Sequence, residues 1–459
     1  MSSTDLMRVS IAAVVLASLA ATARAQHAIS FPDPERYELE NGLEVVLDPV
    51  QGRREVTVLV SYRVGMRDQP AGWTGLAHLV EHLMFEGSLH VPEDSFIPSL
   101  ERAGSLDRNA VTLRDSTDYF QTVPSERLEQ VLFLESDRKA YLLSTHDEES
   151  VAGQRLVVER ERIERRAISG RGALPAMVAR GLYPEGHPYR DVEEVPAHLA
   201  QVRLPQVQWF VQSYYQPANA TLVISGGFDR TRTRAWIERW FGSIRRSAPL
   251  PRRREVERVR LAGERHVTVE ADVPTDELQV IWPTPAYFAP GDAELDVVAH
   301  ILEERLRLAL VERGSALAVG CRQSSRELVS ELSIVVRLGR GQGTAQALAV
   351  VDAELARAAQ GIDEALVRRV REVWFDRLIE RMERSSSRAG LLASRVHDGS
   401  GYTVARDARR YARVDAERAA RAVRVLLPRD RRFVLSVRAN PRAPEGGRVV
   451  SDQLRRSAP

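Results

Sequence analysis

The strongest constraint on the fold is an order of strand-like and helix-like segments that occurs twice along the chain. In the first half, apolar and polar residues alternate on both sides of Asn41-Gly42, which predicts a β-hairpin with a tight turn. Residues 56–64 predict the next strand, residues 76–85 and 128–142 have helical spacing, and residues 221–227 form an apolar strand run.

The second half repeats this order. Residues 267–271 and 278–282 predict strands, residues 293–311 predict a helix, and residues 331–338 and 344–359 predict a further strand and helix. We therefore predict an α+β protein of two homologous α/β-sandwich units. Each unit is expected to be a mostly antiparallel sheet with helices packed on one face.

Prolines and consecutive arginines around residues 249–254 interrupt the pattern and favour a linker between the two units. The predicted divisions are a signal peptide at 1–25, an N-terminal unit at 26–248, a linker at 249–262, a C-terminal unit at 263–445 and a tail at 446–459.

The first 25 residues have the organisation of an export signal. Arg8 supplies a positive charge, residues 9–21 are apolar and small, and Ala23-Arg24-Ala25 fits a cleavage site. We expect cleavage after Ala25 and a periplasmic or secreted protein. An uncleaved membrane anchor is the alternative, although the apolar stretch is shorter than the roughly 20 residues that a spanning helix needs.

Composition excludes several classes of protein. The 65 Lys and Arg residues nearly balance the 63 Asp and Glu residues, which gives no case for nucleic-acid binding. The single cysteine, Cys321, excludes an internal disulfide framework and a cysteine-based zinc cluster. No apolar run of 18 residues follows the N-terminus, so we expect no transmembrane domain after signal removal.

The residues with the clearest chemistry are His78, Glu81 and His82, in the order H-x-x-E-H. On a helix, residues i and i+4 lie on one face, so the two imidazoles can bind a single ion. Zinc fits this set best, because it accepts imidazole ligands and keeps a position open for water. Glu81 is then placed to act as general base on a zinc-bound water. A third protein ligand must come from another element, and two helix histidines beside a solvated glutamate are the simpler alternative.

This order of residues is the inverted zincin signature, and the surrounding sequence resembles the pitrilysin/insulysin family of metallopeptidases. It is most similar to the short bacterial members related to mitochondrial processing peptidase. The matching stretches are 75–88 (GLAHLVEHLMFEGS), 109–112 (NAVT), 115–119 (DSTDY), 135–138 (ESDR), 154–162 (QRLVVERER), 186–189 (GHPY) and 214–220 (YYQPANA).

The resemblance implies a zinc-dependent endopeptidase whose third metal ligand is Glu161, with Glu159 and Glu164 as close rivals in the same charged run. It also implies that Asn109 and Ala110 belong to an edge strand that pairs with the backbone of a peptide or unfolded substrate. An ordinary strand end with Asn in a polar corner is the alternative for these two residues.

The second half departs from the family. Complete catalytic members carry an Arg and a Tyr in the pattern Arg-x6-Tyr, which bind substrate and stabilise the oxyanion. Here Val311 stands near the Arg position and Ala318 or Val319 near the Tyr position, while Arg313 is displaced. Short members of the family form dimers that enclose a chamber, so the resemblance implies a dimer here. Because the Arg/Tyr pair is missing, we predict that this chain is the catalytic subunit and that a family paralogue supplies the pair.

A homodimer that uses another donor, a non-peptidolytic assembly or peptide-binding subunit, and a zinc hydrolase of another bond are the alternatives.

Overall fold

The computed structural model describes most of the chain beyond its N-terminal segment. The described residues are 33–169, 172, 174–246, 249–253, 256–257, 259–396, 403–444 and 447–455. The predicted signal peptide, residues 1–25, lies outside them. Within the described residues, no helix combines the length and apolar character that a membrane span requires.

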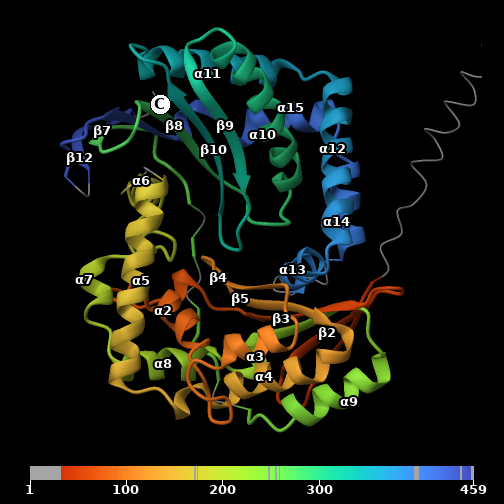
Figure 1. The fold of residues 1–459 in the computed structure, drawn as a ribbon. Helices are drawn as coiled ribbons and strands as arrows, with labels where there is room; N and C mark the ends of the chain where they lie inside the picture. The colour runs from red at the N-terminus through yellow and green to blue at the C-terminus, as the bar shows by residue number, and fades with distance from the viewer. Residues whose placement is uncertain are drawn as a thin grey trace, which may run out of the picture.

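The first half of the chain forms a six-stranded sheet in the order β1-β2-β6-β3-β5-β4 (Figure 1). Its strands are β1 (Glu35–Glu38), β2 (Glu44–Pro49), β3 (Glu55–Tyr62), β4 (Asp107–Thr112), β5 (Thr117–Pro124) and β6 (Ala220–Gly226). Only β2 and β6 pair in parallel. The predicted hairpin at Asn41-Gly42 joins β1 to β2, and Gly42 adopts the positive φ of 91° that the turn requires.

The second half forms another six-stranded sheet in the order β12-β7-β11-β8-β10-β9. Its strands are β7 (Glu264–Ala271), β8 (Glu277–Thr284), β9 (Ala316–Ser324), β10 (Ser330–Leu338), β11 (Phe433–Ala439) and β12 (Arg448–Arg455). Again only one pair, β7 with β11, is parallel. Each strand of the second sheet has a counterpart at the same position of the first sheet, with the same parallel or antiparallel pairing. This correspondence confirms the predicted α+β fold of two homologous units.

The edge strand β12 of the second sheet corrects the expectation of a tail at 446–459. Residues 448–455 form β12, which pairs antiparallel with β7 and occupies the place that β1 has in the first sheet. Most side chains of β12 are exposed, because the strand lies at the sheet edge. A sequence without a buried apolar face can form such a strand because its backbone hydrogen bonds, and not its side chains, attach it to the sheet.

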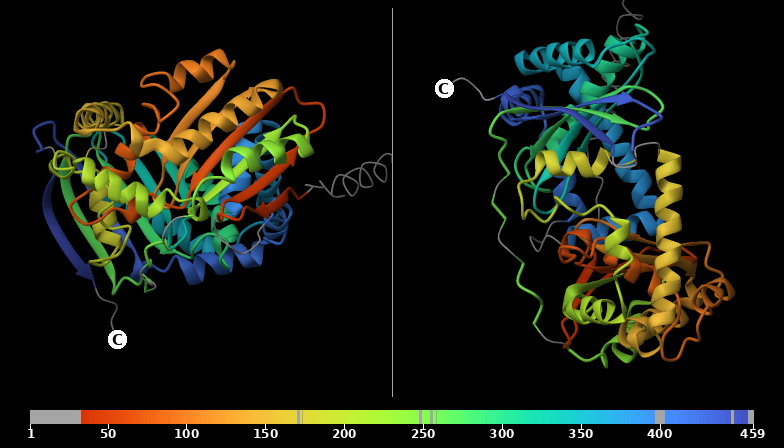
Figure 2. Two further views of the ribbon diagram at one scale, coloured as in Figure 1. Left: turned by 90° about the horizontal axis from the view of Figure 1, so that it is seen from below. Right: turned by 90° about the vertical axis from the view of Figure 1, so that its left-hand side faces the viewer.

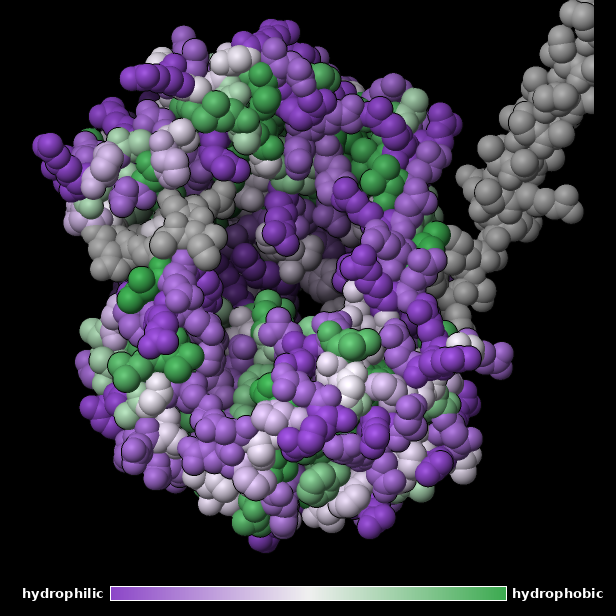
Figure 3. All heavy atoms as spheres, in the orientation of Figure 1, coloured by the Kyte–Doolittle hydropathy of each residue, from purple (hydrophilic) through white to green (hydrophobic). Residues whose placement is uncertain are grey.

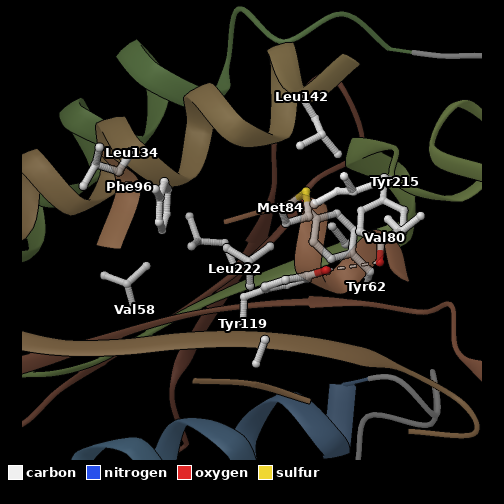
Figure 4. Close-up of a cluster of buried hydrophobic side chains, with 14 of the residues drawn as sticks. Val58, Tyr62, Val80, Met84, Phe96, Tyr119, Leu134, Leu142, Tyr215 and Leu222 are labelled. Atoms are coloured by element: carbon white, nitrogen blue, oxygen red, sulfur yellow. Dashed lines mark hydrogen bonds between the residues drawn. The ribbon is translucent and has the colours of Figure 1, made fainter. Parts of the chain in front are cut away.

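Helices cover the outer face of each sheet. On the first sheet these are α2 (Leu76–Leu83), α3 (Phe96–Arg102), α4 (Leu128–Tyr141), α5 (Glu148–Ser169), α8 (Leu204–Tyr214) and α9 (Arg230–Phe241). Their apolar side chains pack with those of the sheet in the core that Figure 4 shows, where the hydroxyls of Tyr119 and Tyr215 are 3.2 Å apart. On the second sheet the corresponding helices are α10 (Asp292–Leu306), α11 (Thr344–Gln360) and α15 (Ala416–Leu426).

The two units also exchange helices, which the predicted division at residues 248 and 263 does not include. Helix α13 (Ser385–Val396), from the second half, packs on the inner face of the first sheet, where Leu391 and Leu392 belong to the same buried apolar cluster as Val46 and Val223. Helix α6 (Leu174–Leu182), from the first half, packs against β11 of the second sheet. Each sheet is therefore covered on both faces, and one inner helix comes from the other half of the chain.

The segment between α9 and β7 has no helix or strand among its described residues, and it runs along one side of the molecule from one unit to the other (Figure 2).

Candidate metal centre

The site begins with helix α2, in which every residue except His82 is buried. A glutamine side chain fixes the start of the helix: Oε1 of Gln69 accepts hydrogen bonds from the backbone N–H groups of Gly75 (2.9 Å) and Ala77 (3.0 Å). These bonds satisfy amides that lack partners within the helix. Gly75 has a φ of 96°, which favours glycine there. These hydrogen bonds and the burial of the helix fix the position of the backbone that carries His78 and His82.

His78, His82 and Glu161 come together as the sequence predicts. Nε2 of His78 and Nε2 of His82 are 3.2 Å apart. The carboxylate oxygens of Glu161, on α5, lie 3.5 Å from the first nitrogen and 3.6 Å from the second. One ligand atom from each residue lies within 4.8 Å of the other two.

The two alternative glutamates on α5, Glu159 and Glu164, do not face the imidazole pair. Glu159 forms an ion pair with Arg162, three residues later, at 2.8 Å. This hydrogen bond lowers the pKa of Glu159, and burial opposes the shift. Glu164 is exposed. Among the three acids of the charged run, Glu161 is the one that faces the imidazole pair.

Glu81 is buried next to this group and contacts the edge of the first sheet. Its Oε2 atom accepts a hydrogen bond from Oγ1 of Thr112 at 2.5 Å. Thr112 ends β4, the outer strand of the sheet, and the same strand carries Asn109 and Ala110. Oδ1 of Asn109 accepts the backbone N–H of Ala110 at 2.9 Å. The structure thus brings the expected substrate strand beside the expected base, and the role of Thr112 was not foreseen from the sequence.

A second acid, Glu194, contacts the opposite side of the His78 ring. Its Oε1 atom lies 2.9 Å from Nδ1 of His78. Arg165, on α5, lies 3.4 Å from Oε2 of Glu194 and also 3.4 Å from Nδ1 of His78. Sequence analysis missed Glu194, because nothing in its spacing from His78 indicates proximity.

The electrostatic surroundings favour neutral imidazole at His82. Burial lowers the pKa of His82, the neighbouring His78 lowers it further, and Glu161 and Glu81 oppose the shift. Burial raises the pKa of Glu194, but contact with His78 and Arg165 outweighs burial and leaves the pKa below its ordinary value. Burial also raises the pKa of Asp118, on β5, to about 6.

The region where the family carries its Arg and Tyr lies in the second unit. Val311 ends a short π-helix, Arg307–Val311, and Ala318 and Val319 lie on β9, the outer strand of the second sheet. By topology, β9 is the counterpart of β4 in the first unit.

A cleft of about 1540 Å³ opens beside the site and is lined by both units. Arg165 and Glu194 lie on its wall, as do Val267 and Phe433 of the second sheet. Figure 3 shows that the face of the molecule is hollowed between the two units, with hydrophilic side chains around much of the hollow.

The sequence matches the models of two protein families. Residues 44–169 match the model of the insulinase family (peptidase family M16), and residues 201–373 match that of the M16 peptidase inactive domain. The two matches together cover more than half of the chain. The chain belongs to the insulinase family. The resemblance to pitrilysin-type peptidases is thereby confirmed.

Several proteins named as zinc proteases match part of this chain in sequence. The chain is 28% identical over 301 residues to the zinc protease PqqE of Helicobacter pylori, which covers 64% of this chain and 66% of that protein. It is 25% identical over 212 residues to the uncharacterized zinc protease YmxG of Bacillus subtilis, covering 46% and 50%. It is 26% identical over 224 residues to the probable zinc protease PqqL of Escherichia coli, covering 46% and 23%. The matches thus span from under a quarter to about two thirds of these relatives.

Solved structures show the same fold. A protease from Helicobacter pylori aligns over 89% of this chain and 100% of its own, with a TM-score of 0.81 and 21% identity. The periplasmic protease PqqL of Escherichia coli aligns over 90% of this chain but 48% of its own, with a TM-score of 0.72 and 19% identity.

The donor atoms fit the metal that the family implies. Two imidazole nitrogens and one carboxylate facing a common point are a protein ligand set of catalytic zinc, which leaves a fourth position open. The partial exposure of the Glu161 side chain leaves the site accessible from solvent.

Proposed function

We propose that this protein is an exported zinc-dependent endopeptidase that hydrolyses peptides or unfolded segments. The observation that carries the proposal is the convergence of His78, His82 and Glu161, with the buried Glu81 on the same helix. A merely structural ion-pair cluster would not need two imidazole nitrogens 3.2 Å apart beside a carboxylate.

In this proposal, His78, His82 and Glu161 hold Zn²⁺. When bound, the zinc polarises the peptide carbonyl and lowers the pKa of the attacking water. Glu81 takes the proton from that water and transfers it to the leaving amine. Thr112 donates to one oxygen of Glu81 and orients the carboxylate, so the other oxygen is free to accept the proton.

The substrate is proposed to bind as an extended strand along β4. This strand is the open edge of the first sheet, so its outward backbone groups are available for pairing. Asn109 and Ala110 lie on the strand that Thr112 ties to Glu81. Backbone pairing explains how such an enzyme would accept unfolded chains with little sequence preference.

We further propose that the active form is a dimer that encloses a chamber, with a family paralogue supplying the Arg and the Tyr. In this chain Val311 stands near the Arg position, and Ala318 or Val319 near the Tyr position. The match to 48% of PqqL supports this arrangement, because that protein has room for a second pair of units of similar size. If a purified preparation of this chain alone reached full peptidase activity, the heterodimer would be rejected and a self-sufficient enzyme or homodimer would take its place.

We propose a periplasmic or secreted location, because residues 1–25 have the features of a cleavable signal. The relative PqqL is described as a periplasmic protease, which supports this assignment. N-terminal sequencing of the exported protein is expected to begin at Gln26, and retention of residues 1–25 would favour a membrane anchor.

The test of the central chemistry is the change Glu81→Gln. This variant keeps the ligand residues and the shape of the side chain but cannot accept the proton. We expect it to retain zinc and lose hydrolysis of an unfolded peptide, measured together with the partner if one co-purifies. Glu126→Gln, at an exposed glutamate of the same unit, is the matched control and should behave as the parent. Retained turnover in Glu81→Gln would reject the base assignment, and a parent that binds no zinc would favour a peptide-binding subunit.

A further inference from the structure

The ring of His78 has contacts on both of its nitrogens, whereas a metal ligand uses only one. Nε2 faces His82 and Glu161, and Nδ1 faces Glu194 at 2.9 Å. In a neutral imidazole one nitrogen carries the proton and the other offers a lone pair. The partner of Nδ1 therefore decides whether the lone pair is available at Nε2, on the side of the proposed metal.

Two groups compete for Nδ1, and they require opposite protonation states. The Glu194 carboxylate can only accept a hydrogen bond from a protonated Nδ1, whereas the Arg165 guanidinium can only donate a hydrogen bond to an unprotonated Nδ1. The carboxylate is the closer group, at 2.9 Å against 3.4 Å for the guanidinium. Arg165 also lies 3.4 Å from the other oxygen of Glu194, so it has an acceptor without His78. The shorter contact favours a protonated Nδ1, which would also give the buried Oε1 of Glu194 the hydrogen-bond donor that it otherwise lacks among the described residues.

Glu194 is largely buried, in a loop that is hydrogen-bonded to the start of α2. Its side chain is 11% exposed, and it lies in the loop that leads into α7 (Pro196–Leu199). The next residue, Val195, donates its backbone N–H to Oγ1 of Thr74 at 3.0 Å, which attaches this loop directly before helix α2. The loop is thus joined to the start of α2 by the hydrogen bond from Val195 to the Thr74 hydroxyl, and to the helix itself by the carboxylate–imidazole contact.

We infer that Glu194 is a positioning residue that keeps the proton of His78 on Nδ1 and aims the Nε2 lone pair at the metal. The inference rests on the proposed zinc site, and it assigns a residue outside the three ligands and the base. A carboxylate that accepts a hydrogen bond from a metal-binding histidine fixes the orientation of the ring and raises the basicity of the other nitrogen. His82 has no comparable carboxylate partner on its second ring nitrogen among the described contacts, so Glu194 acts on one ligand only.

The test compares the zinc affinity of the full chain with those of Glu194→Ala and Glu194→Gln. The chains are stripped with a chelator, and zinc dissociation constants are measured by competition with a chromogenic chelator at neutral pH. We expect Glu194→Ala to bind zinc about 10- to 100-fold more weakly, as for other partners of ligating histidines. The zinc affinity of Glu194→Gln should lie between those of the alanine variant and the parent. Its amide oxygen can accept a hydrogen bond from Nδ1, but it carries no charge.

Asp191→Ala is the matched control, because Asp191 is an exposed acid of the same loop that pairs with Arg180 and Arg190 and not with His78. It should bind zinc as the parent does. The thermal midpoints of the metal-free chains separate positioning from folding: a merely structural Glu194 would lower the midpoint without changing zinc affinity. If Glu194→Ala does not fold, the glutamine variant decides in the same way.

Unchanged zinc affinity in Glu194→Ala and Glu194→Gln, with tight binding by the parent, would overturn the role of Glu194 and leave the proposed peptidase intact. Failure of the parent itself to bind zinc would overturn both.

Discussion

The hydroxyl of Thr112 donates a hydrogen bond to Oε2 of Glu81 at 2.5 Å, which connects the open edge of the first sheet to the helix that carries the two histidines. This hydrogen bond directly links the strand proposed to bind substrate to the residue proposed to move the proton. A substrate strand that pairs with β4 would therefore lie next to the general base without any further rearrangement of the fold.

We predict that Thr112→Val lowers kcat while leaving zinc content unchanged. The change removes the donor but keeps the shape, and a hydrogen bond to a charged group contributes about 1.5–3 kcal/mol, or roughly a 10- to 100-fold rate effect if it is lost in the transition state. Thr112→Ser, which keeps a hydroxyl, should restore most of the rate. Equal rates for the valine variant and the parent would show that Thr112 does not orient Glu81.

We predict that zinc binding distinguishes Glu161 from its neighbours. Glu161→Gln should weaken zinc by more than about 100-fold, since losing a ligand exceeds the roughly 10- to 100-fold effect of altering a partner of a ligand. Glu159→Gln removes only the ion pair with Arg162, and Glu164→Gln changes an exposed side chain, so both should bind zinc as the parent does. Loss of zinc in Glu159→Gln, with retention in Glu161→Gln, would move the third ligand to Glu159.

The spacing of His78 and His82 was sufficient to predict that the two imidazoles share a face, because helix geometry is local. Glu161 lies on a different helix, and only the resemblance to a family selected it from the acidic run. Glu194 could not be predicted at all, since its approach to His78 depends on how a loop packs against α2. Local periodicity predicts elements, but the contacts between elements depend on the whole fold.

The ion pair between Arg388 and Asp48 joins α13 of the second half to β2 of the first, at 2.7 Å in a largely buried position. We predict that Arg388→Ala destabilises the protein by about 3 kcal/mol, because it leaves a buried carboxylate without its cation. Arg384→Ala is the control: that side chain is exposed and its ion pair with Glu380 should contribute less than about 1 kcal/mol. Urea unfolding of both variants measures the difference, and equal stabilities would contradict a structural role for the exchanged helix.

The exchange of helices explains why the predicted domain limits were incomplete. An apolar helix stripe shows which face of α13 is buried, but it does not show whether the partner is the sheet of its own half or that of the other half. The strand β12 escaped prediction for a related reason. Its sequence, RVVSDQLR, does not alternate regularly, and an edge strand with both faces exposed has no apolar pattern to detect.

Lys139, the single lysine of the chain, predicts a pH-dependent stability. Burial lowers its pKa to about 7, and the nearby Glu135 opposes this shift only in part. Between pH 7 and the ordinary lysine pKa of about 10.4, the unfolded chain therefore binds more protons than the folded one, so the unfolding free energy rises with pH. From pH 7 to about 9.5 the rise due to Lys139 should be about 3 kcal/mol.

The variant Lys139→Met has no titrating group at this position and should lack that rise. Urea unfolding of the parent and the variant at both pH values isolates the contribution of Lys139 from those of other groups. If both proteins gained stability equally with pH, the buried amine would not be the cause.

The most direct test of the zinc site is anomalous diffraction at the zinc edge from crystals of the purified chain. The account predicts one zinc peak among Nε2 of His78, Nε2 of His82 and the carboxylate of Glu161. Absence of that peak from zinc-supplemented crystals, or a zinc ion held by other residues, would contradict the account.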